Sequence, residues 1–264
     1  MIPKIIHYCW FGKGVMPERD RQCIDSWKKK CPDYEIILWN EDNYDLSKND
    51  YMKQAYQCQK WGFVPDYARL DIIYNYGGIY LDTDVEIIKS FDELLNNKGF
   101  AGFEEDRFVA LGLGFGAEKG NLLIKELMDQ YNGRVFIRED GSLDTTSSPL
   151  LSTIVFQKQG FVMNGKEQNV NGFVLYPTDV FCPMNYKTGK LTITENTRSI
   201  HWYNASWFTE VQKKELDTKR RINKVFGVKL GSFIFKLVKY STNPKRLFNR
   251  IINKDDTYYK EFKQ

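Results

Sequence analysis

Residues 77–85 read Gly77-Gly78-Ile79-Tyr80-Leu81-Asp82-Thr83-Asp84-Val85, and this stretch decides the fold. A glycine pair leads into a short apolar run, as at the start of a buried strand, and the run ends in two carboxylates. Successive strand side chains point to opposite faces, so Asp82 and Asp84 point the same way if the strand continues between them. Ligands of open α/β sheets bind beyond the carboxyl ends of the strands. We therefore expect a ligand site here.

The chemistry of this pair leaves two interpretations. Two carboxylates on one side of a strand end suit a hard divalent cation such as Mg²⁺ or Mn²⁺. The structural alternative is a turn in which both aspartates cap backbone N–H groups. An isolated Asp-x-Asp favours the alternative, so the surrounding residues have to decide between them.

Short apolar strands alternate with helical segments along most of the chain, a pattern typical of an α/β fold with a mainly parallel sheet. We expect further strands at residues 5–11, 34–39, 100–104, 173–177 and 198–202, and helices at 17–30, 50–61, 66–75, 91–96 and 121–131. No repeat or low-complexity linker interrupts the pattern before Glu210. We therefore expect one domain over residues 1–210.

The composition indicates a folded core. The chain has 264 residues, of which 42% are hydrophobic, so global disorder is excluded. Its five cysteines are odd in number and lack C-x-x-C spacing, which favours reduced, buried thiols in a cytoplasmic protein over disulfides or a zinc site. The first strand follows Met1 closely, and no uncharged apolar run reaches 18 residues, so we expect neither a signal peptide nor a membrane span.

The net charge of +4 hides an asymmetry. Residues 211–254 hold 13 Lys/Arg and 2 acidic residues, whereas the remainder is acidic overall. Hydrophobic residues interleave with these charges, so we expect residues 211–264 to form a basic amphipathic helical segment. Such a segment fits an anionic membrane surface better than a nucleic acid, which would place the protein on the inner face of the membrane. The alternative is a solvated helical face that packs on the body.

Asp66 and Arg69 stand at the start of the helix that precedes the glycine pair. Pro65 disfavours helix before it, and Asp66 is a suitable N-cap. Residues three apart lie on one side of a helix, so the two can form a local ion pair. As functional groups, they offer an acceptor for sugar hydroxyls and a cation for phosphate.

Three further features are candidates for a ligand site. His201 ends an apolar strand and could complete a site begun by two carboxylates, or it could be structural. Trp10 ends the first strand, where it could stack on a flat base or belong to the core. Residues 111–116 read Leu-Gly-Leu-Gly-Phe-Gly, which is not a phosphate-binding G-x-G-x-x-G and indicates close backbone packing near a ligand.

Four blocks together resemble the family 32 glycosyltransferases, the DXD sugar-transferase group. The blocks are residues 2–12, residues 65–69, residues 77–84, and His201 through Ser206-Trp207. The group includes bacterial capsular-polysaccharide transferases and fungal mannosyltransferases, with the clostridial glucosylating toxins as distant relatives. The resemblance implies a GT-A fold, which is Rossmann-like, with a nucleotide-sugar donor and Mn²⁺ or Mg²⁺. It favours a UDP-sugar over GDP-mannose.

The resemblance also implies roles for individual residues. Asp84 would be the direct metal ligand, with Asp82 and His201 as further ligands, and Arg69 would act beside both aspartates in catalysis. The donor would be held by Trp10 on the base, by Asp66, Arg69, Tyr80 and Asp82 on the sugar and ribose, and by Ser206 and Trp207 on the diphosphate. The sequence departs from the family pattern at residues 111–116, where relatives often carry a polar residue, so the acceptor side stays open.

The implied reaction is retaining transfer of a hexose to a saccharide or lipid-linked saccharide in surface or capsular polysaccharide synthesis. A metal and Arg69 can take the charge of a departing diphosphate without a general acid. No second carboxylate at an assignable position offers a covalent double displacement, so we favour front-face attack by the acceptor hydroxyl, with Glu104 and Glu105 as candidates to orient it.

Two rival functions share some of these features. Residues 81–85 also fit the nucleophile motif of haloacid-dehalogenase-like phosphatases, but that motif belongs on a first strand, and about eighty residues precede it here. The second rival is a non-catalytic sugar-binding or membrane-scaffold protein.

Overall fold

The computed structural model describes residues 1–205 and 208–241, so Ser206, Trp207 and the end of the basic segment lie outside the described residues. The described chain divides into two compact units, one of residues 1–184 and 192–205, the other of residues 185–191 and 208–241. The expected boundary at Glu210 stays a prediction. No described helix is long and apolar enough to cross a membrane.

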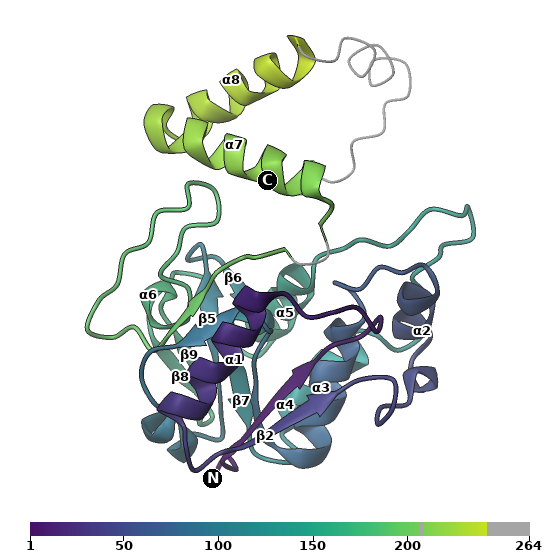
Figure 1. Cartoon of the computed structure of the whole chain (residues 1–264). Helices are drawn as coiled ribbons and strands as arrows, with labels where there is room; N and C mark the ends of the chain where they lie inside the picture. The colour runs from purple at the N-terminus through teal and green to yellow at the C-terminus, as the bar shows by residue number, and fades with distance from the viewer. Residues whose placement is uncertain (206–207, 242–264) are drawn as a thin grey trace. The chain divides into compact units, whose positions relative to one another are not determined.

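The first unit is a mixed sheet flanked by helices (Figure 1). Its strands are β1 (Ile5–Cys9), β2 (Glu35–Trp39), β3 (Gly78–Tyr80), β4 (Val85–Ile87), β5 (Gly99–Glu104), β6 (Phe108–Ala110), β7 (Phe115–Ala117), β8 (Gln168–Val170), β9 (Phe173–Tyr176) and β10 (Ser199–His201). Its helices are α1 (Glu18–Lys30), α2 (Asp50–Gln57), α3 (Pro65–Tyr76), α4 (Leu122–Asp129), α5 (Ser148–Lys158) and α6 (Thr178–Phe181), with shorter helical turns η1 (Leu46–Lys48), η2 (Asp92–Asn96) and η3 (Leu111–Leu113).

The main sheet has the order β2-β1-β3-β7-β5-β9-β8, with β6 paired to β5. Strands β1, β2, β3, β5 and β9 run in one direction, and β6, β7 and β8 run in the other. The prediction of a mixed, mainly parallel α/β sheet is therefore confirmed. A separate two-stranded sheet joins β4 to β10 in antiparallel register.

Alternation along the strands divides the core between the two faces of the sheet. Ile79 and Phe100 belong to the cluster that contains Trp27 of α1, and α1 lies in front of the sheet in Figure 1. Their neighbours Tyr80 and Ala101 belong to the cluster formed with α2 to α5. The sheet is therefore covered by helices on both faces, as expected of buried parallel strands.

The glycine pair before β3 is a steric requirement. Gly77 and Gly78 have φ of 69° and 99°, in the left-handed region that favours glycine. A Cβ on Gly78 would lie 2.7 Å from the carbonyl oxygen of Ile5 and 3.0 Å from Nε2 of His7. Only glycine lets β3 begin this close to β1.

The structure corrects three local expectations. The helix predicted to reach residue 61 ends at Gln57, because Gln59 has a left-handed φ of 55° and the chain turns there. Pro65 is the first residue of α3, so Val64 occupies the N-cap position and Asp66 lies inside the first turn. Strand β3 ends at Tyr80 and does not continue to Asp84.

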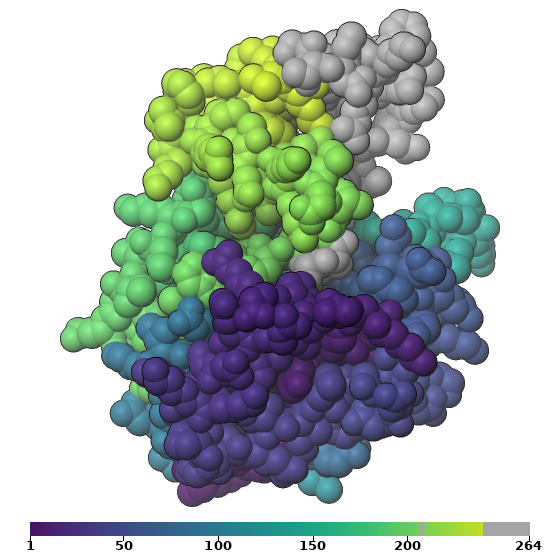
Figure 2. All heavy atoms as spheres, viewed as in Figure 1, coloured from purple at the N-terminus to yellow at the C-terminus, as the bar shows by residue number. Residues whose placement is uncertain are grey.

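The second unit contains a helical hairpin of α7 (Glu210–Phe226) and α8 (Val228–Ser241) (Figure 1), whose atoms are light green to yellow in Figure 2. Thr209 caps α7, and its side chain and that of Gln212 exchange hydrogen bonds with each other's backbone N–H. Gly231 of α8 packs against Asn223 of α7, where a Cβ would lie 2.6 Å from Oδ1. The predicted helical character is confirmed as far as residue 241.

Candidate active site

The two aspartates lie in a tight turn between two sheets, which we call the DXD turn (residues 81–85). The backbone N–H of Leu81 donates to the carbonyl of His7, at 3.1 Å, which fixes the turn to the main sheet. The N–H of Val85 donates to the carbonyl of Asp82 at 3.1 Å, closing the turn, and the chain then enters β4. The turn, and not a continued strand, sets where the carboxylates point.

Asp84 is held by the strand that pairs with β4. In the β4–β10 ladder His201 is opposite Val85, so the imidazole reaches the preceding residue. Nε2 of His201 lies 3.1 Å from Oδ1 of Asp84, and the N–H of Asn204 donates to Oδ2 at 2.8 Å. Burial alone would raise the pKa of Asp84, but the charge and hydrogen bond of His201 hold it below its usual range. Asp84 is therefore ionised at neutral pH.

Asp82 is held by Arg69. Nη1 of Arg69 lies 3.7 Å from Oδ1 of Asp82, and the Asp82 side chain is 30% exposed. Burial raises the pKa of Asp82, Arg69 opposes that rise, and the charge of Asp84 adds to it. The charge of Asp84 acts on Asp82, and the charge of His201 acts on both aspartates, so the two carboxylates border the same site. The sequence-based expectation that they face the same region is consistent with this geometry.

Arg69 also forms the predicted ion pair at the start of α3. Nη2 of Arg69 lies 2.9 Å from Oδ1 of Asp66, with both side chains almost fully buried. Its Nε donates to the carbonyl of Pro65, and its guanidinium carbon lies 5.2 Å from the centre of the Tyr80 ring. Burial raises the pKa of Asp66 to about 6, although the charge of Arg69 opposes the rise. Arg69 therefore links Asp66 to Asp82 inside the protein.

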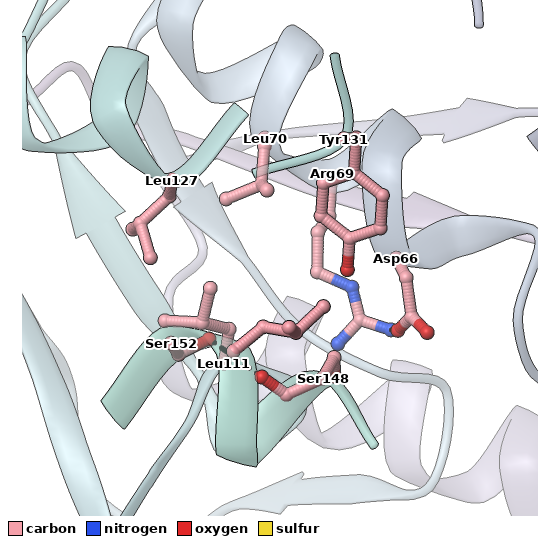
Figure 3. A pocket seen from close by; sticks show the side chains of 9 residues that line it. Asp66, Arg69, Leu70, Leu111, Leu127, Tyr131, Ser148 and Ser152 are labelled. Carbon is pink, nitrogen blue, oxygen red and sulfur yellow. Dashed lines mark hydrogen bonds and ion pairs between the residues drawn. The ribbon is translucent and has the colours of Figure 1, made fainter. Parts of the chain in front are cut away.

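A cavity opens beside this ion pair (Figure 3). It encloses about 230 Å³ of space, part of it open to solvent, and its lining includes Asp66, Arg69, Tyr131, Ser148 and Ser152. Figure 3 shows the guanidinium of Arg69 between the carboxylate of Asp66 and the side chain of Ser148. One wall is therefore charged and hydroxyl-bearing, and leucines form the rest.

A glycine from the predicted close-packing segment contacts Asp82. The N–H of Asp82 donates to the carbonyl of Gly112 at 3.3 Å. A Cβ on Gly112 would lie 2.2 Å from Oδ2 of Asp82 and 3.3 Å from Nη1 of Arg69. The expectation of close packing near the site is confirmed at Gly112, since any side chain there would displace the carboxylate.

The remaining residues predicted to bind the donor are Trp10, Tyr80, Ser206 and Trp207. Trp10 follows β1 and is partly exposed, and its indole N–H donates to the carbonyl of Gly14 at 2.7 Å. Tyr80 is 1% exposed, and its ring lies against the guanidinium of Arg69. The roles of Trp10 and Tyr80 on a nucleotide stay predictions. Ser206 and Trp207 lie outside the described residues.

Glu104 is linked to His201 through Tyr203. The hydroxyl of Tyr203 donates to Oε1 of Glu104 at 2.7 Å, and the Tyr203 ring centre lies 4.1 Å from that of His201. Burial lowers the pKa of His201, but the charge and hydrogen bond of Asp84 outweigh burial and the charge of Glu104 adds to their effect. The pKa of His201 is therefore raised. The hairpin turn after Glu104 puts Glu105 in the left-handed region, at a φ of 51°.

Sequence reasoning missed Asp20, a fully buried carboxylate of α1. It accepts from the Thr83 hydroxyl at 3.3 Å and from Nδ2 of Asn204 at 2.7 Å. A signal was present, because Asp20 shares the helical spacing of Cys23, Ile24 and Trp27 and so stands on their buried face. A carboxylate on an apolar helix face usually marks a specific partner.

The residues at the DXD turn fit a divalent metal ion that takes part of its coordination shell from a ligand. Within the described residues, no group of three or more His, Cys, Asp or Glu side chains is ready to hold a metal ion. The chain does offer two carboxylates and an imidazole, and Nδ1 of His201 is buried without a hydrogen-bond partner. Oxygen atoms of a diphosphate and of water would have to complete the shell.

Comparison with known proteins agrees with this site. Residues 17–101 match the family model described as a glycosyltransferase sugar-binding region containing a DXD motif, so the match includes the Asp66–Arg69 pair and the DXD turn. The first block of the resemblance and the His201 block lie outside the matched residues. Members of this family generally use a divalent metal ion and a nucleotide sugar.

Two curated relatives illustrate the likeness. Inositol phosphoceramide mannosyltransferase 1 of Schizosaccharomyces pombe is 31% identical over 127 residues, covering 41% of this chain and 38% of the relative. Lactosylceramide 4-alpha-galactosyltransferase of Rattus norvegicus is 28% identical over 132 residues, covering 48% and 33%. The chain thus spans little more than a third of the length of these relatives.

Among solved structures, the glycosyltransferase GlyE of Streptococcus pneumoniae TIGR4 is similar with a TM-score of 0.47 at 11% identity, covering 92% of this chain and 64% of GlyE. The fold described above rests on the strand pairings themselves. The family resemblance inferred from the sequence is confirmed by the match of residues 17–101 to the DXD-containing sugar-binding region of the glycosyltransferases.

Proposed function

We propose that this protein is a retaining, metal-dependent glycosyltransferase that moves a hexose from a nucleotide sugar to a saccharide or lipid-linked saccharide. The proposal rests on one observation, which is that five charged or titratable side chains lie around the DXD turn. Arg69 contacts both Asp66 and Asp82, and Asp84, in the same turn as Asp82, contacts His201. Asp66 and Arg69 supply buried groups of opposite charge that suit sugar hydroxyls and phosphate oxygens.

In this proposal each group has a defined task. Asp84, with Asp82 and His201, would hold Mn²⁺ or Mg²⁺, which would polarise the diphosphate. Arg69 stabilises the negative charge that develops on the leaving diphosphate as the bond from its oxygen to the sugar C1 breaks. The acceptor hydroxyl attacks C1 from the face that the diphosphate leaves, which retains the configuration, and its proton passes to an oxygen of the departing diphosphate. Glu104, which accepts a hydrogen bond from Tyr203, is the candidate to orient that hydroxyl.

The test is a screen of UDP-, GDP- and CMP-sugars with Mn²⁺, first by thermal shift and then by hydrolysis. A ligand that binds only the folded state raises its stability, so a donor raises the melting temperature in a metal-dependent way. We expect a UDP-hexose to give the largest shift and slow release of hexose. A phosphatase would instead release phosphate from aryl phosphates, and a non-catalytic binding protein would give a shift without turnover.

We propose in addition that the α7–α8 hairpin attaches the enzyme to the anionic inner face of the membrane, where lipid-linked acceptors for surface polysaccharide are found. Leu230, Phe233 and Leu237 of α8 recur at helical spacing and are 54%, 58% and 55% exposed, and Phe226 at the end of α7 is 50% exposed. Phe233 and Leu237 lie on the side of α8 away from Gly231, which packs on α7. Both relatives above are named for ceramide-linked substrates.

The charges of the hairpin favour lipid as the partner of this apolar stripe. Helix α8 contains no acidic residue, and Lys229 and Lys236 are exposed beside the stripe. An apolar stripe flanked by lysines matches the interface of an anionic bilayer. The basic residues beyond 241 lie outside the described residues.

Vesicle flotation tests the attachment. We expect the full chain to float with vesicles of phosphatidylcholine and phosphatidylglycerol and not with phosphatidylcholine alone. The double variant Leu230→Gln/Leu237→Gln should bind at least about tenfold more weakly, because two apolar anchors are lost. The control is Leu122→Gln in α4, where a leucine is 77% exposed in the other unit. Equal binding by both variants would overturn the proposal, as would self-association through the stripe without lipid.

A further inference from the structure

Asp20 has no direct place in the chemistry described above, yet its environment is unusual. It is a fully buried carboxylate, and no described lysine, arginine or histidine forms an ion pair with it. Burying an unpaired carboxylate costs several kcal/mol or moves its pKa. Burial does raise the pKa of Asp20, and the charge of Asp84 raises it further. A buried carboxylate of this kind indicates that its hydrogen bonds hold other segments of the chain in place.

The two donors to Asp20 come from segments on either side of Asp84. Thr83 is the middle residue of the DXD turn, and its hydroxyl donates to Oδ2 of Asp20. Asn204 follows β10, and its side-chain amide donates to Oδ1 at 2.7 Å while its own backbone N–H donates to Asp84. A carboxylate suits this position because it offers one acceptor oxygen to each segment.

The backbone around Asn204 adds an independent observation. Tyr203 and Ala205, the residues on both sides, have φ of 52° and 45°, in the left-handed region that costs about 1–2 kcal/mol for residues other than glycine. Strained backbone of this kind persists only where contacts over-determine it. The side chain of Asn204, held by Asp20, is such a contact.

We propose that Asp20 is a positioning residue of this site, whose carboxylate clasps the DXD turn to the segment after β10 and thereby sets Asp84 against Asn204 and His201. We call Asp20, Thr83 and Asn204 the Asp20 clasp. The clasp itself is a property of the fold, and its consequence for metal binding rests on the proposed function. Helix α1 supports the same turn elsewhere, since Trp27 donates to the carbonyl of Val85 and Ser26 accepts from the N–H of Ile87.

A double-mutant cycle tests the clasp without any ligand. Asn204→Asp places two carboxylates in contact, so we expect deuterium uptake by the backbone of residues 199–205 to rise at least about tenfold. Asp20→Asn alone keeps an acceptor oxygen for Asn204 and should change uptake less than about threefold. The swap Asp20→Asn/Asn204→Asp restores a donor–acceptor pair of the original total charge, and uptake should return to within about threefold of the unaltered protein.

The matched control is the pair Asp71 and Asn75 of α3, in which Nδ2 of Asn75 donates to Oδ1 of Asp71 at 2.8 Å. The swap Asp71→Asn/Asn75→Asp should leave uptake at residues 199–205 unchanged. If the Asp20→Asn/Asn204→Asp swap is no better protected than Asn204→Asp, residues 20 and 204 are not coupled and the clasp is wrong.

A Mn²⁺ titration, followed by the electron paramagnetic resonance of the free ion, then separates the clasp from the proposed function. Asn204→Ala should bind Mn²⁺ about tenfold more weakly, whereas the swap binds within about threefold of the unaltered protein. If the unaltered protein binds Mn²⁺ and Asn204→Ala binds it equally, the clasp does not position the site. If no form binds Mn²⁺ but the exchange cycle shows coupling, the clasp stands and the proposed metal dependence falls.

Discussion

At the scale of single residues, the site depends on how closely the chain approaches the two carboxylates. Gly112 leaves room for Oδ2 of Asp82, and Asn204 and His201 each occupy one oxygen of Asp84. Arg69 lies between Asp66 and Asp82, so its charge is shared by two acids. Small substitutions at these positions should displace the charged side chains of the site while changing the free energy of unfolding little.

Gly112→Ala should show this separation. The added methyl group meets the end of the Asp82 side chain at 2.2 Å, and a side-chain carboxylate can shift. We therefore expect the free energy of unfolding to fall by less than about 1 kcal/mol, whereas donor hydrolysis falls at least about tenfold because Asp82 is displaced. Urea unfolding and hydrolysis rates measure the two effects. The control is Gly14→Ala, which meets open space at an ordinary φ. Full activity in Gly112→Ala would contradict the placement of Asp82.

His7 should make stability depend on pH. The indole N–H of Trp39 donates to Nδ1 at 3.1 Å, so Nε2 carries the proton and donates to the carbonyl of Gly77 at 2.9 Å. Burial lowers the pKa of His7 to about 4 from its usual value. Between about pH 6.5 and 4 the unfolded chain therefore binds a proton that the folded protein does not, so stability falls as the pH falls.

The shift corresponds to a loss of up to about 3 kcal/mol between pH 7 and pH 4. Urea unfolding of the unaltered protein and of His7→Gln, at pH 7, 5.5 and 4.5, measures the effect. All other titratable groups are the same in the two proteins, so the difference between their pH profiles belongs to His7. We expect a steeper loss of stability in the unaltered protein. If both proteins lose stability equally as the pH falls, folding does not lower the pKa of His7 and the prediction is wrong.

At the scale of elements, α1 and β4 together form the support of the DXD turn. Trp27 is fully buried, and its indole N–H donates to the carbonyl of Val85 at 2.6 Å, directly after the turn. The pairing of β4 with β10 then places His201 beside Asp84. The second sheet thus exists to join residues that are far apart in the sequence.

Trp27→Phe should destabilise the first unit. The variant removes the donor to Val85 and leaves a gap in the core, so we expect the free energy of unfolding to fall by about 2–4 kcal/mol in urea. Trp61→Phe provides a comparison, because Trp61 is only partly buried and packs on Gly12. A loss of under about 1 kcal/mol at Trp27 would show that α1 does not support the turn.

The elements were predictable where a local pattern specifies them. The apolar strands and the helical spacing of α1 could be read directly, and the Gly77-Gly78 pair located the start of β3. The break at Tyr80 could not, because it follows from the pairing of β4 with β10, and residues 199–201 give no local sign of that partner. The same long-range pairing hid the Asp20 clasp, of which only the polar residue on the buried face of α1 was visible.

At the scale of the whole molecule, the proposed chemistry and the proposed membrane attachment belong to different units. The proposed catalytic residues that the structure describes all lie in the first unit, and the exposed apolar stripe lies in the second. Each unit has its own packing, since α8 is held to α7 by Gly231 and by an ion pair of Lys239 with Glu215 at 2.6 Å.

Deleting the residues after Glu210 should therefore separate the two functions. We expect the shortened chain to hydrolyse the donor within about threefold of the full rate and to lose flotation with anionic vesicles. Hydrolysis and flotation are measured on the same preparation. Retained flotation would place the lipid contact on the first unit, and loss of donor hydrolysis in a folded product would assign part of the site to the removed segment.

The proposed chemistry depends on Asp84, and Mn²⁺-dependent hydrolysis of a UDP-hexose by Asp84→Asn tests it most directly. The amide keeps an acceptor for the N–H of Asn204, so the turn should stay folded and the melting temperature should change little. We predict that hydrolysis falls at least about a hundredfold and that Mn²⁺ no longer raises the melting temperature in the presence of UDP. A folded Asp84→Asn protein that hydrolyses the donor at the unaltered rate would contradict the account.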